Sequence, residues 1–375
     1  MDLVDAARAR LGAVEAYSPG RASPAGPPSA KLSSNESPLG PAPAVRDALV
    51  GAVSSVQRYP DQARALQALA GHLGVAPTQL LLTNGSDELC YLIAAAFLGP
   101  GTVAVVGDPC YQIDATASLL SGATVHRVPL RDGAHDLEAM AKAAQDAAVV
   151  WLPTPHNPTG VAAEPSEVEA LVEQVPRDCL VVVDEAYRAF CDEVLRPVAP
   201  ELVAAHPNTV FQRTLSKDWG LAGVRIGYGL GAPGVIEVLG RARPPFSVNS
   251  LALAAVGAVG ASRPWRDMTV ARVIEQRSLL EAELDRLGIE HFPSQANFVT
   301  ARIDPDRVAA ALAPSGLVVR DGRDLGLPGW VRISVGWAPT MAQLRAALAR
   351  LARRSDTVDD RVRGTTPVQS TEERS

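Results

Sequence analysis

The chain has 375 residues, of which 47% are hydrophobic and 20% charged, as in a globular enzyme long enough for two domains. Its formal net charge of -6 and the lack of a concentrated basic patch argue against a nucleic-acid partner. Apolar runs are too short to span a membrane, and Asp2 and Asp5 precede an amphipathic run unlike a signal peptide. The four cysteines show no metal-ligand spacing, so we expect reduced thiols in a cytoplasmic protein.

Strand-like and helical patterns alternate from about residue 45 to 245, which indicates a parallel sheet covered by helices. Residues 18–30, rich in Pro, Gly, Ser and Ala, read as an extended connection before this region. A helical stretch over about 248–286, interrupted at Pro264, leads into further strands and helices. Strands are expected to begin near Leu80, Thr102, Ala123, Val149, Leu180, Val210 and Arg225, and later near Asn297, Leu317 and Trp330.

These patterns predict an α/β protein with two unequal domains. The large domain covers 45–245 and the smaller α+β domain covers 246–355, joined by the N-terminal segment 1–44. The last helix is expected over about 340–353. Residues 356–375 are polar, charged and poor in large apolar side chains, so we predict a disordered tail.

The first strands end in residues that could bind a ligand. Gly85 permits a tight turn, after which the N–H groups of Ser86 and Asp87 would open a helix and point at an anion. An ordinary capping turn is the competing interpretation. Tyr111 follows the next strand and could either stack on a pyridine ring or belong to the core.

Two later strands also end in polar residues. Asn157 lies between prolines that stiffen the backbone, and its amide could donate to an oxygen of a bound ring, although a plain turn competes. Asp184 follows the β-branched run 181–183, at the strand end where open α/β sheets bind ligands. Unless it caps a helix, a buried carboxylate there needs a cation such as a protonated pyridine nitrogen. Tyr187 could then reach the ring's phenolic oxygen.

Lys217 suits an aldehyde cofactor that carries a phosphate. Its amine can form a Schiff base, while Ser216 and Arg225 can hold the phosphate. A Ser-Lys pair is more often a plain surface feature, but the strand ends upstream favour the functional interpretation. His156 is expected to be structural or to contact substrate, because Lys217 already fills the acid-base role.

The residues Asn157, Asp184, Tyr187, Lys217 and Arg225, in this order and spacing, resemble the fold-type I pyridoxal-phosphate enzymes of the class I and II aminotransferases. Within that family the chain is most similar to the histidinol-phosphate aminotransferases. The similarity extends over about residues 15–350 through the motifs at 34–41, 58–61, 213–223, 319–321 and 331–336. It implies a large domain with a mostly parallel seven-stranded sheet and a smaller α+β domain.

The resemblance also implies an activity: transfer of an amino group between an amino acid or histidinol phosphate and a 2-oxo acid such as 2-oxoglutarate. Lys217 would hold pyridoxal 5′-phosphate as a Schiff base and move the proton at the substrate's α-carbon, and Asp184 would pair with the pyridinium nitrogen. The other implied contacts are Ser86, Asp87, Ser216 and Arg225 at the cofactor phosphate, Tyr111 stacked on the ring, Asn157 and Tyr187 at the ring oxygen, Arg332 at the substrate carboxylate, Arg320 and Tyr17 at the substrate phosphate, and Asn35 at the substrate. Tyr59 of a neighbouring subunit would reach the cofactor phosphate, which implies a homodimer with shared active sites.

Three departures from the family pattern leave the substrate open. Asp114 replaces a usual aromatic residue, Asp218-Trp219 replaces Ala-Phe, and Ser37 replaces an asparagine. If Asp114 faces the substrate, it favours a cationic group, such as that of a basic amino acid, whereas the competing interpretation places it on a helix surface. A decarboxylase or cyclase on the same scaffold is a further alternative, because Ser37-Pro38-Leu39-Gly40 resembles a segment of threonine-phosphate decarboxylases.

Overall fold

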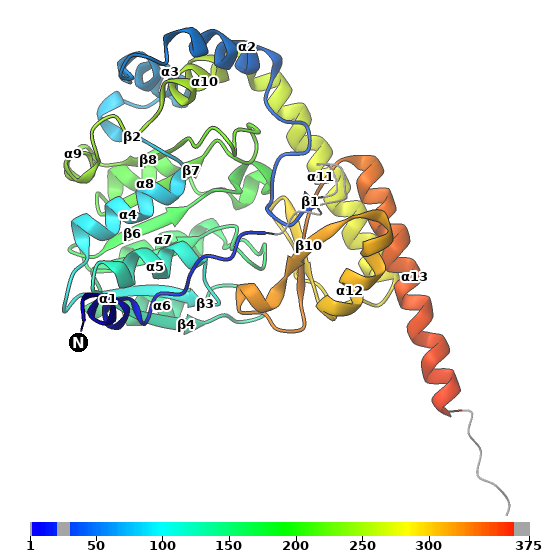
Figure 1. Ribbon diagram of the computed structural model, residues 1–375. Coiled ribbons are helices and arrows are strands. Elements are labelled where there is room, and N and C mark those ends of the chain that lie inside the picture. Colours follow the sequence, from blue (N-terminus) through cyan, green and yellow to red (C-terminus); the bar gives the residue numbers. More distant parts are fainter. Residues whose placement is uncertain (1, 21–30, 364–375) are drawn as a thin grey trace, which may run out of the picture.

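A seven-stranded sheet forms the centre of the large domain (Figure 1). The computed structural model describes residues 2–20 and 31–363. Strand β8 runs opposite to the other six strands of this sheet, so the predicted mostly parallel α/β fold is confirmed. In spatial order the strands are β2 (Leu80–Thr83), β8 (Gly227–Gly231), β7 (Thr209–Thr214), β6 (Leu180–Asp184), β5 (Val149–Pro153), β3 (Val103–Asp108) and β4 (Thr124–Pro129).

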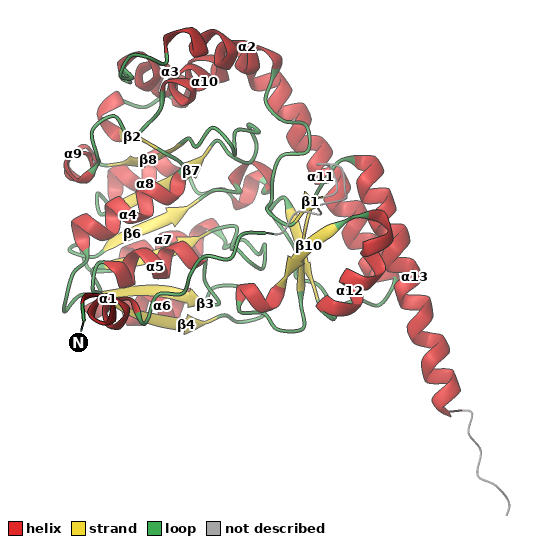
Figure 2. Ribbon diagram, in the orientation of Figure 1, coloured by secondary structure: helices red, strands yellow, loops and turns green. Residues whose placement is uncertain are grey.

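Helices cover both faces of this sheet (Figure 2), which explains why its central strands are apolar at nearly every position. Alternate residues of one strand pack on opposite faces: Val181 and Val183 belong to one core cluster, and Val182 belongs to the other. One face carries α4 (Ser86–Phe97), α5 (Gln112–Leu120) and α9 (Pro233–Ala242), and the other carries α2 (Pro43–Ala52), α3 (Ala63–Leu73), α6 (Leu137–Ala143), α7 (Pro165–Gln174), α8 (Ala199–Ala205) and α10 (Ser250–Val259).

The small domain is built on a four-stranded sheet that lies beside the carboxyl ends of the large sheet's parallel strands (Figure 1). Its order is β1 (Lys31–Leu32), β10 (Val318–Asp321), β11 (Val331–Ser334) and β9 (Phe298–Ala301). Because β1 pairs in parallel with β10, the N-terminal segment becomes part of this sheet. The helices that pack here are α11 (Arg263–Arg286), α12 (Pro305–Leu312) and α13 (Ala338–Arg363), while α1 (Leu3–Leu11) lies beside the large domain.

Each predicted strand start lies within two residues of the observed one, because the apolar runs and the turns that bound them are local signals. The end of the last helix differs from the prediction. Helix α13 continues to Arg363 instead of about residue 353, since no glycine or proline interrupts the chain between Pro339 and Gly364. The rest of the predicted tail, 364–375, lies outside the described residues. Among the described helices, none combines the length and apolar character needed to span a bilayer.

The small domain's core should respond strongly to loss of volume. Leu284 of α11 is fully buried in that core, whereas Leu279 of the same helix is 44% exposed. Leu284→Ala should therefore lower the free energy of unfolding by about 3 kcal/mol, and Leu279→Ala by less than about 1 kcal/mol. Urea unfolding of the two variants measures this difference, and equal losses would contradict the packing described.

Candidate active site

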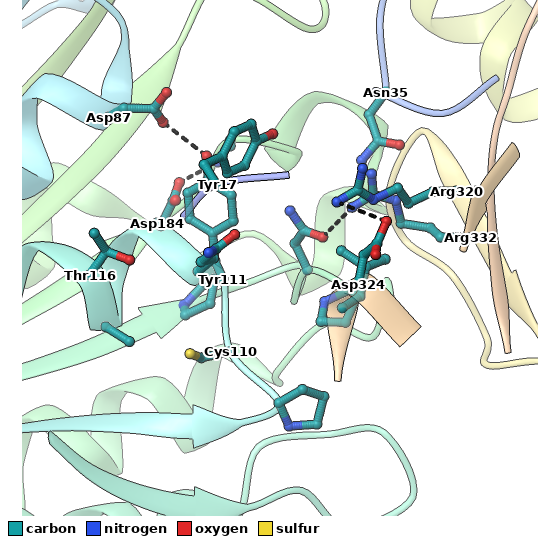
Figure 3. Close-up of a pocket in the computed structure, with 18 of the residues that line it drawn as sticks. Tyr17, Asn35, Asp87, Cys110, Tyr111, Thr116, Asp184, Arg320, Asp324 and Arg332 are labelled. Atoms are coloured by element: carbon teal, nitrogen blue, oxygen red, sulfur yellow. Dashed lines mark hydrogen bonds and ion pairs between the residues drawn. The ribbon is translucent and has the colours of Figure 1, made fainter. Parts of the chain in front are cut away.

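A cavity of about 600 Å³ lies between the carboxyl ends of the large sheet's strands and the small domain (Figure 3). This is where ligands bind in open α/β sheets. Of the fourteen residues with predicted site roles, only Tyr59 is not part of its lining. The predicted residues that line it are Tyr17, Asn35, Ser86, Asp87, Tyr111, Asn157, Asp184, Tyr187, Ser216, Lys217, Arg225, Arg320 and Arg332.

Asp184 ends strand β6 and is only 7% exposed. Its Oδ1 accepts a hydrogen bond from the Ala186 N–H at 2.9 Å, and its Oδ2 accepts one from Nε2 of Gln212 at 3.0 Å. Burial raises the pKa of Asp184 to about 7, although both hydrogen bonds oppose the shift. A cationic group bound beside Asp184 would restore its charged form.

Gln212 was not identified from the sequence. It lies opposite Asp184 in the register of β6 and β7 and is fully buried. The available signal was an amide directly after the apolar pair Val210-Phe211, and only the pairing of the two strands gives that amide a partner.

Lys217 lines the same cavity as Asp184. Its Nζ lies 3.4 Å from the Ser34 carbonyl oxygen and 5.9 Å from the centre of the Tyr187 ring. Burial and then the Arg332 charge lower the pKa of Lys217 to about 8. The amine therefore becomes largely neutral, and nucleophilic, above about pH 8 instead of at the higher pH that an exposed lysine requires.

The start of α4 and the side chain of Arg225 form a place suited to an anion. We refer to Ser86, Asp87 and Arg225 as the anion cradle. The helix begins after Gly85, at φ +82°, with no side-chain cap, so its first N–H groups can face a ligand. The side chain of Arg225 lies beside this turn, with Nη2 3.2 Å from Asp87 Oδ2. A Cβ on Gly227 would lie 2.5 Å from the Ser86 nitrogen, so the close approach of the strand to the cradle requires glycine.

The side chain of Asp87 has a position that the sequence did not indicate. Its carboxylate accepts a 2.9 Å hydrogen bond from the Tyr111 hydroxyl (Figure 3). The same carboxylate pairs with Arg225 at 3.2 Å. The predicted role of Asp87 concerned its backbone N–H alone. The side chain of Asp87 therefore links Tyr111 to Arg225.

Asn35, Asn157 and Arg332 surround the phenol of Tyr187. Its oxygen accepts from Asn35 Nδ2 at 3.0 Å and from Asn157 Nδ2 at 3.4 Å. Arg332 donates through Nη1 to Asn157 Oδ1 at 2.7 Å and through Nη2 to the Ser33 carbonyl at 3.1 Å. This network joins the small domain, the N-terminal segment and the large domain at one point.

Two arginines lie opposite each other on β10 and β11. Arg320 and Arg332 are register partners, and they are only 4% and 7% exposed. Arg320 donates through Nη2 to the Ser18 carbonyl at 2.6 Å and lies 3.6 Å from Asp324. Within the described part of the chain, Arg320 Nη1 and Arg332 Nε are buried without a hydrogen-bond partner. Like charges opposed in this way are destabilising, so the pair suits an anionic ligand.

The position of Asp114 contradicts both interpretations of this residue, the substrate contact and the helix surface. It is 1% exposed, so it does not lie on a helix surface, and it is absent from the cavity lining, so it does not face a substrate. Its carboxyl contacts the Cys90 sulfur at 3.6 Å. This side chain points toward α4 and the core instead of the cavity, as its contact with Cys90 of α4 shows.

Other predicted residues lie outside the main cavity. Tyr59 is 81% exposed and stacks on Phe246 with ring centres 4.5 Å apart. His156 is buried, with Nδ1 3.0 Å from the Thr159 hydroxyl. Asp218 and Trp219 line a second cavity of about 290 Å³.

The lining fits pyridoxal 5′-phosphate at three separate points. A buried carboxylate lacking a cation suits the ring nitrogen, an amine of lowered pKa suits the aldehyde, and an uncapped helix start with an arginine suits the phosphate. These groups come from β6, the loop after β7 and the start of α4, so the large sheet alone brings them together.

Comparison with known proteins agrees with this geometry. Residues 28–351 match the family model described as aminotransferase class I and II. The chain is 38% identical over 362 residues to histidinol-phosphate aminotransferase 1 of Dechloromonas aromatica, covering 93% of this chain and 99% of that protein. It is 40% identical to histidinol-phosphate aminotransferase 1 of Thiobacillus denitrificans, covering 86% of this chain and 85% of that protein. A solved histidinol-phosphate aminotransferase from Sinorhizobium meliloti, in complex with pyridoxal-5′-phosphate, superimposes with a TM-score of 0.79 and 29% identity over 86% of this chain and 90% of that one.

The lowered pKa of Lys217 predicts how the cofactor-free protein reacts with the cofactor's aldehyde. Only the neutral amine attacks, so the rate of covalent capture should rise with pH and level off above about pH 8. Stopped-flow absorbance at a series of pH values measures this rate, and Lys217→Arg should lack the reaction. A rate that kept rising toward pH 10 would contradict the burial described.

The raised pKa of Asp184 predicts a pH-dependent stability of the cofactor-free protein. Between about pH 4 and pH 7 only the folded chain holds this proton. The contribution of Asp184 to stability is therefore complete below about pH 4, falls as the pH rises, and is lost once the pH has passed about 7. Asp184→Asn should remove this loss, which amounts to at most about 4 kcal/mol.

Urea unfolding of the cofactor-free protein at pH 5 and pH 8 tests this expectation. Asp178→Asn, at an exposed position before the same strand, is the matched control and should leave the pH dependence unchanged. If Asp184→Asn also left the pH dependence unchanged, the shift assigned to Asp184 would be wrong.

Proposed function

Because this chain belongs to the class I and II aminotransferases and works with pyridoxal 5′-phosphate, we propose that its amino donor is histidinol phosphate and its acceptor is a 2-oxo acid such as 2-oxoglutarate. The observation that carries this proposal is the buried pair Arg320 and Arg332. A phosphate dianion can neutralise both guanidinium groups, whereas a single carboxylate neutralises one.

The names of the relatives agree with this substrate. Those at 38% and 40% identity are histidinol-phosphate aminotransferases, and the chain covers 99% and 85% of their lengths. The donor's phosphate would lie against Arg320 and Arg332, with Tyr17 at the rim of the same cavity. In the second half of the reaction the oxo acid would place a carboxylate on the same pair, so one anion site serves both substrates.

Pyridoxal 5′-phosphate supplies the electron sink for the bonds at the substrate's α-carbon. Asp184 would hold the proton of the ring nitrogen and so maintain that sink. Lys217 would bind the cofactor's aldehyde through its amine, and it would accept and return the proton at the substrate's α-carbon. Asn157 and Tyr187 would hold the ring oxygen, and Tyr111 would stack on the ring face.

The cofactor's phosphate would be held by backbone N–H groups at the start of α4 and by two side chains. Ser216 is anchored here, because its hydroxyl accepts a hydrogen bond from the Thr214 hydroxyl at 2.9 Å. Arg225 supplies the charge. Asn35 would contact the substrate from the N-terminal segment, where it is held by Ser334 at 2.7 Å.

The cavity gives no support to the alternative in which the substrate is a basic amino acid. It rested on Asp114 facing the substrate, and Asp114 does not line the cavity. The decarboxylase alternative rested on a short motif at 37–40 and gains no further support from the cavity.

We also propose a cytoplasmic homodimer. Tyr59 and Phe246 form an exposed aromatic stack on the large domain, and Val50, Val53 and Val56 are exposed nearby in the chain. Such a patch suits a second copy, whose cofactor Tyr59 would reach. Cys90, Cys110, Cys179 and Cys191 are free thiols, as expected in a reducing compartment.

The arginine pair provides a test with opposite outcomes for two variants. Arg320→Gln should lower kcat/KM for histidinol phosphate about a hundredfold, because a charge-assisted contact to phosphate is lost. In the same variant, kcat/KM for glutamate as the donor should fall less than about tenfold, because Arg332 remains to bind a carboxylate. Asp324→Asn should leave kcat/KM for histidinol phosphate unchanged or raise it, since it removes a competing carboxylate from Arg320. Equal losses for both donors in Arg320→Gln would contradict the proposal.

A further inference from the structure

Behind Asp184, on the side away from the cavity, lies a buried row of polar side chains. Gln212 donates from Nε2 to Asp184 Oδ2 at 3.0 Å. The Cys90 sulfur lies 3.4 Å from Gln212 Oε1 and 3.6 Å from Asp114 Oδ1. Cys90 and Gln212 are fully buried, and Asp114 is 1% exposed. The row therefore connects α5, α4 and β7 to the carboxylate at the end of β6.

The surroundings of this row are apolar. Cys90 belongs to the core cluster that contains Ile113 and Val182, and the row passes through it. Polar groups cost free energy in such a place unless each one has a partner. This chain therefore buries the carboxyl group of Asp114 inside an apolar cluster.

The hydrogen bonds along the row can run in one consistent direction. Burial and then the charge of Asp184 raise the pKa of Asp114 well above its ordinary value, which favours the neutral acid with an O–H to donate. Burial likewise raises the pKa of the Cys90 thiol, which keeps its S–H. Asp114 can then donate to Cys90, and Cys90 to Gln212 Oε1, so the Gln212 amide nitrogen faces Asp184. The other charged group near the row is Asp87.

We propose that Asp114 is a positioning residue that acts through Cys90 and Gln212 to hold the Asp184 carboxylate, in its charged form, against the ring nitrogen of the cofactor. The contact with Cys90 satisfies the carbonyl oxygen of Gln212. Without that contact the amide could turn and present its oxygen to Asp184, where two acceptors would repel. This inference rests on the role proposed for Asp184 but is independent of the substrate.

The consequence concerns the proton on the cofactor ring. A less stable Asp184 anion would hold that proton less firmly and bind the cofactor more weakly. Loss of the ring's positive charge would in turn let the Lys217 nitrogen keep its own proton to higher pH, because a repelling charge is gone. The visible absorbance of the bound cofactor reports that second titration.

The experiment titrates the absorbance of the holoenzyme, without substrate, in matched variants. Gln212→Leu and Asp114→Leu should raise the midpoint by about 0.5–1 pH unit and weaken cofactor affinity about tenfold. Asp114→Asn keeps a neutral donor of the same shape and should shift the midpoint by less than half as much. Ser118→Ala is the control for disturbed packing, because Ser118 bonds Trp151 and the backbone of Asp114 but not its carboxyl.

Cys90 offers a second pair of variants should a leucine variant fail to fold. Cys90→Ala breaks the row and should shift the midpoint like Asp114→Leu, whereas Cys90→Ser keeps a donor and an acceptor and should restore most of the original value. Equal shifts in Cys90→Ala and Cys90→Ser, or equal shifts in Asp114→Leu and Ser118→Ala, would overturn the proposal. An unchanged midpoint in both Cys90→Ala and Asp114→Leu would also overturn it.

The cofactor-free protein gives a readout that does not depend on the loaded site. Burial raises the pKa of Asp114, so the folded chain resists its ionisation. The folded chain therefore loses stability as the pH rises, because the anion is costly to bury. Asp114→Asn should therefore flatten the fall in stability toward high pH, and an unchanged slope would count against a neutral Asp114. None of these measurements uses a substrate, so failure of the histidinol phosphate proposal would leave them unaffected.

Discussion

A carboxylate buried at the end of a parallel strand is the constraint on which the site depends. Asp184 is almost inaccessible and lacks a cationic side chain beside it in the described structure, so its charge is stabilised only by an amide and a backbone N–H until a ligand brings a cation. Strand β6 fixes the direction of this carboxylate, and β7 supplies Gln212 in register. The buried carboxylate of Asp184 therefore destabilises the cofactor-free large domain, and it marks a binding group for a cation.

The two domains divide the chemistry between them. The large sheet gathers the groups that we propose for the cofactor ring, aldehyde and phosphate, whereas β10 and β11 of the small domain carry the arginine pair that we propose for the substrate's anion. The N-terminal segment links the halves, because Asn35 bonds both Tyr187 and Ser334. A ligand that touches the cofactor and the arginines must therefore bridge the domains, and its binding should favour one arrangement of them.

The sequence predicted what local patterns determine. Strand starts followed from apolar runs bounded by turns, and the residues that follow those strands meet in one cavity because parallel strands share their carboxyl edge. What it missed depends on pairing across the chain. The Gln212 contact needs the register of β6 and β7, and the opposition of Arg320 and Arg332 needs that of β10 and β11. The burial of Asp114 needs the packing of α5 on α4, which its position near Tyr111 does not reveal.

The central claim is that Asp184 keeps the cofactor's ring nitrogen protonated. The direct measurement is the ¹⁵N chemical shift of that nitrogen in holoenzyme loaded with ¹⁵N-labelled pyridoxal 5′-phosphate, followed from pH 6 to pH 9. We predict the shift of a protonated pyridine throughout this range, and the shift of a free pyridine in Asp184→Asn. A free pyridine shift in the unmodified enzyme at neutral pH would contradict the account.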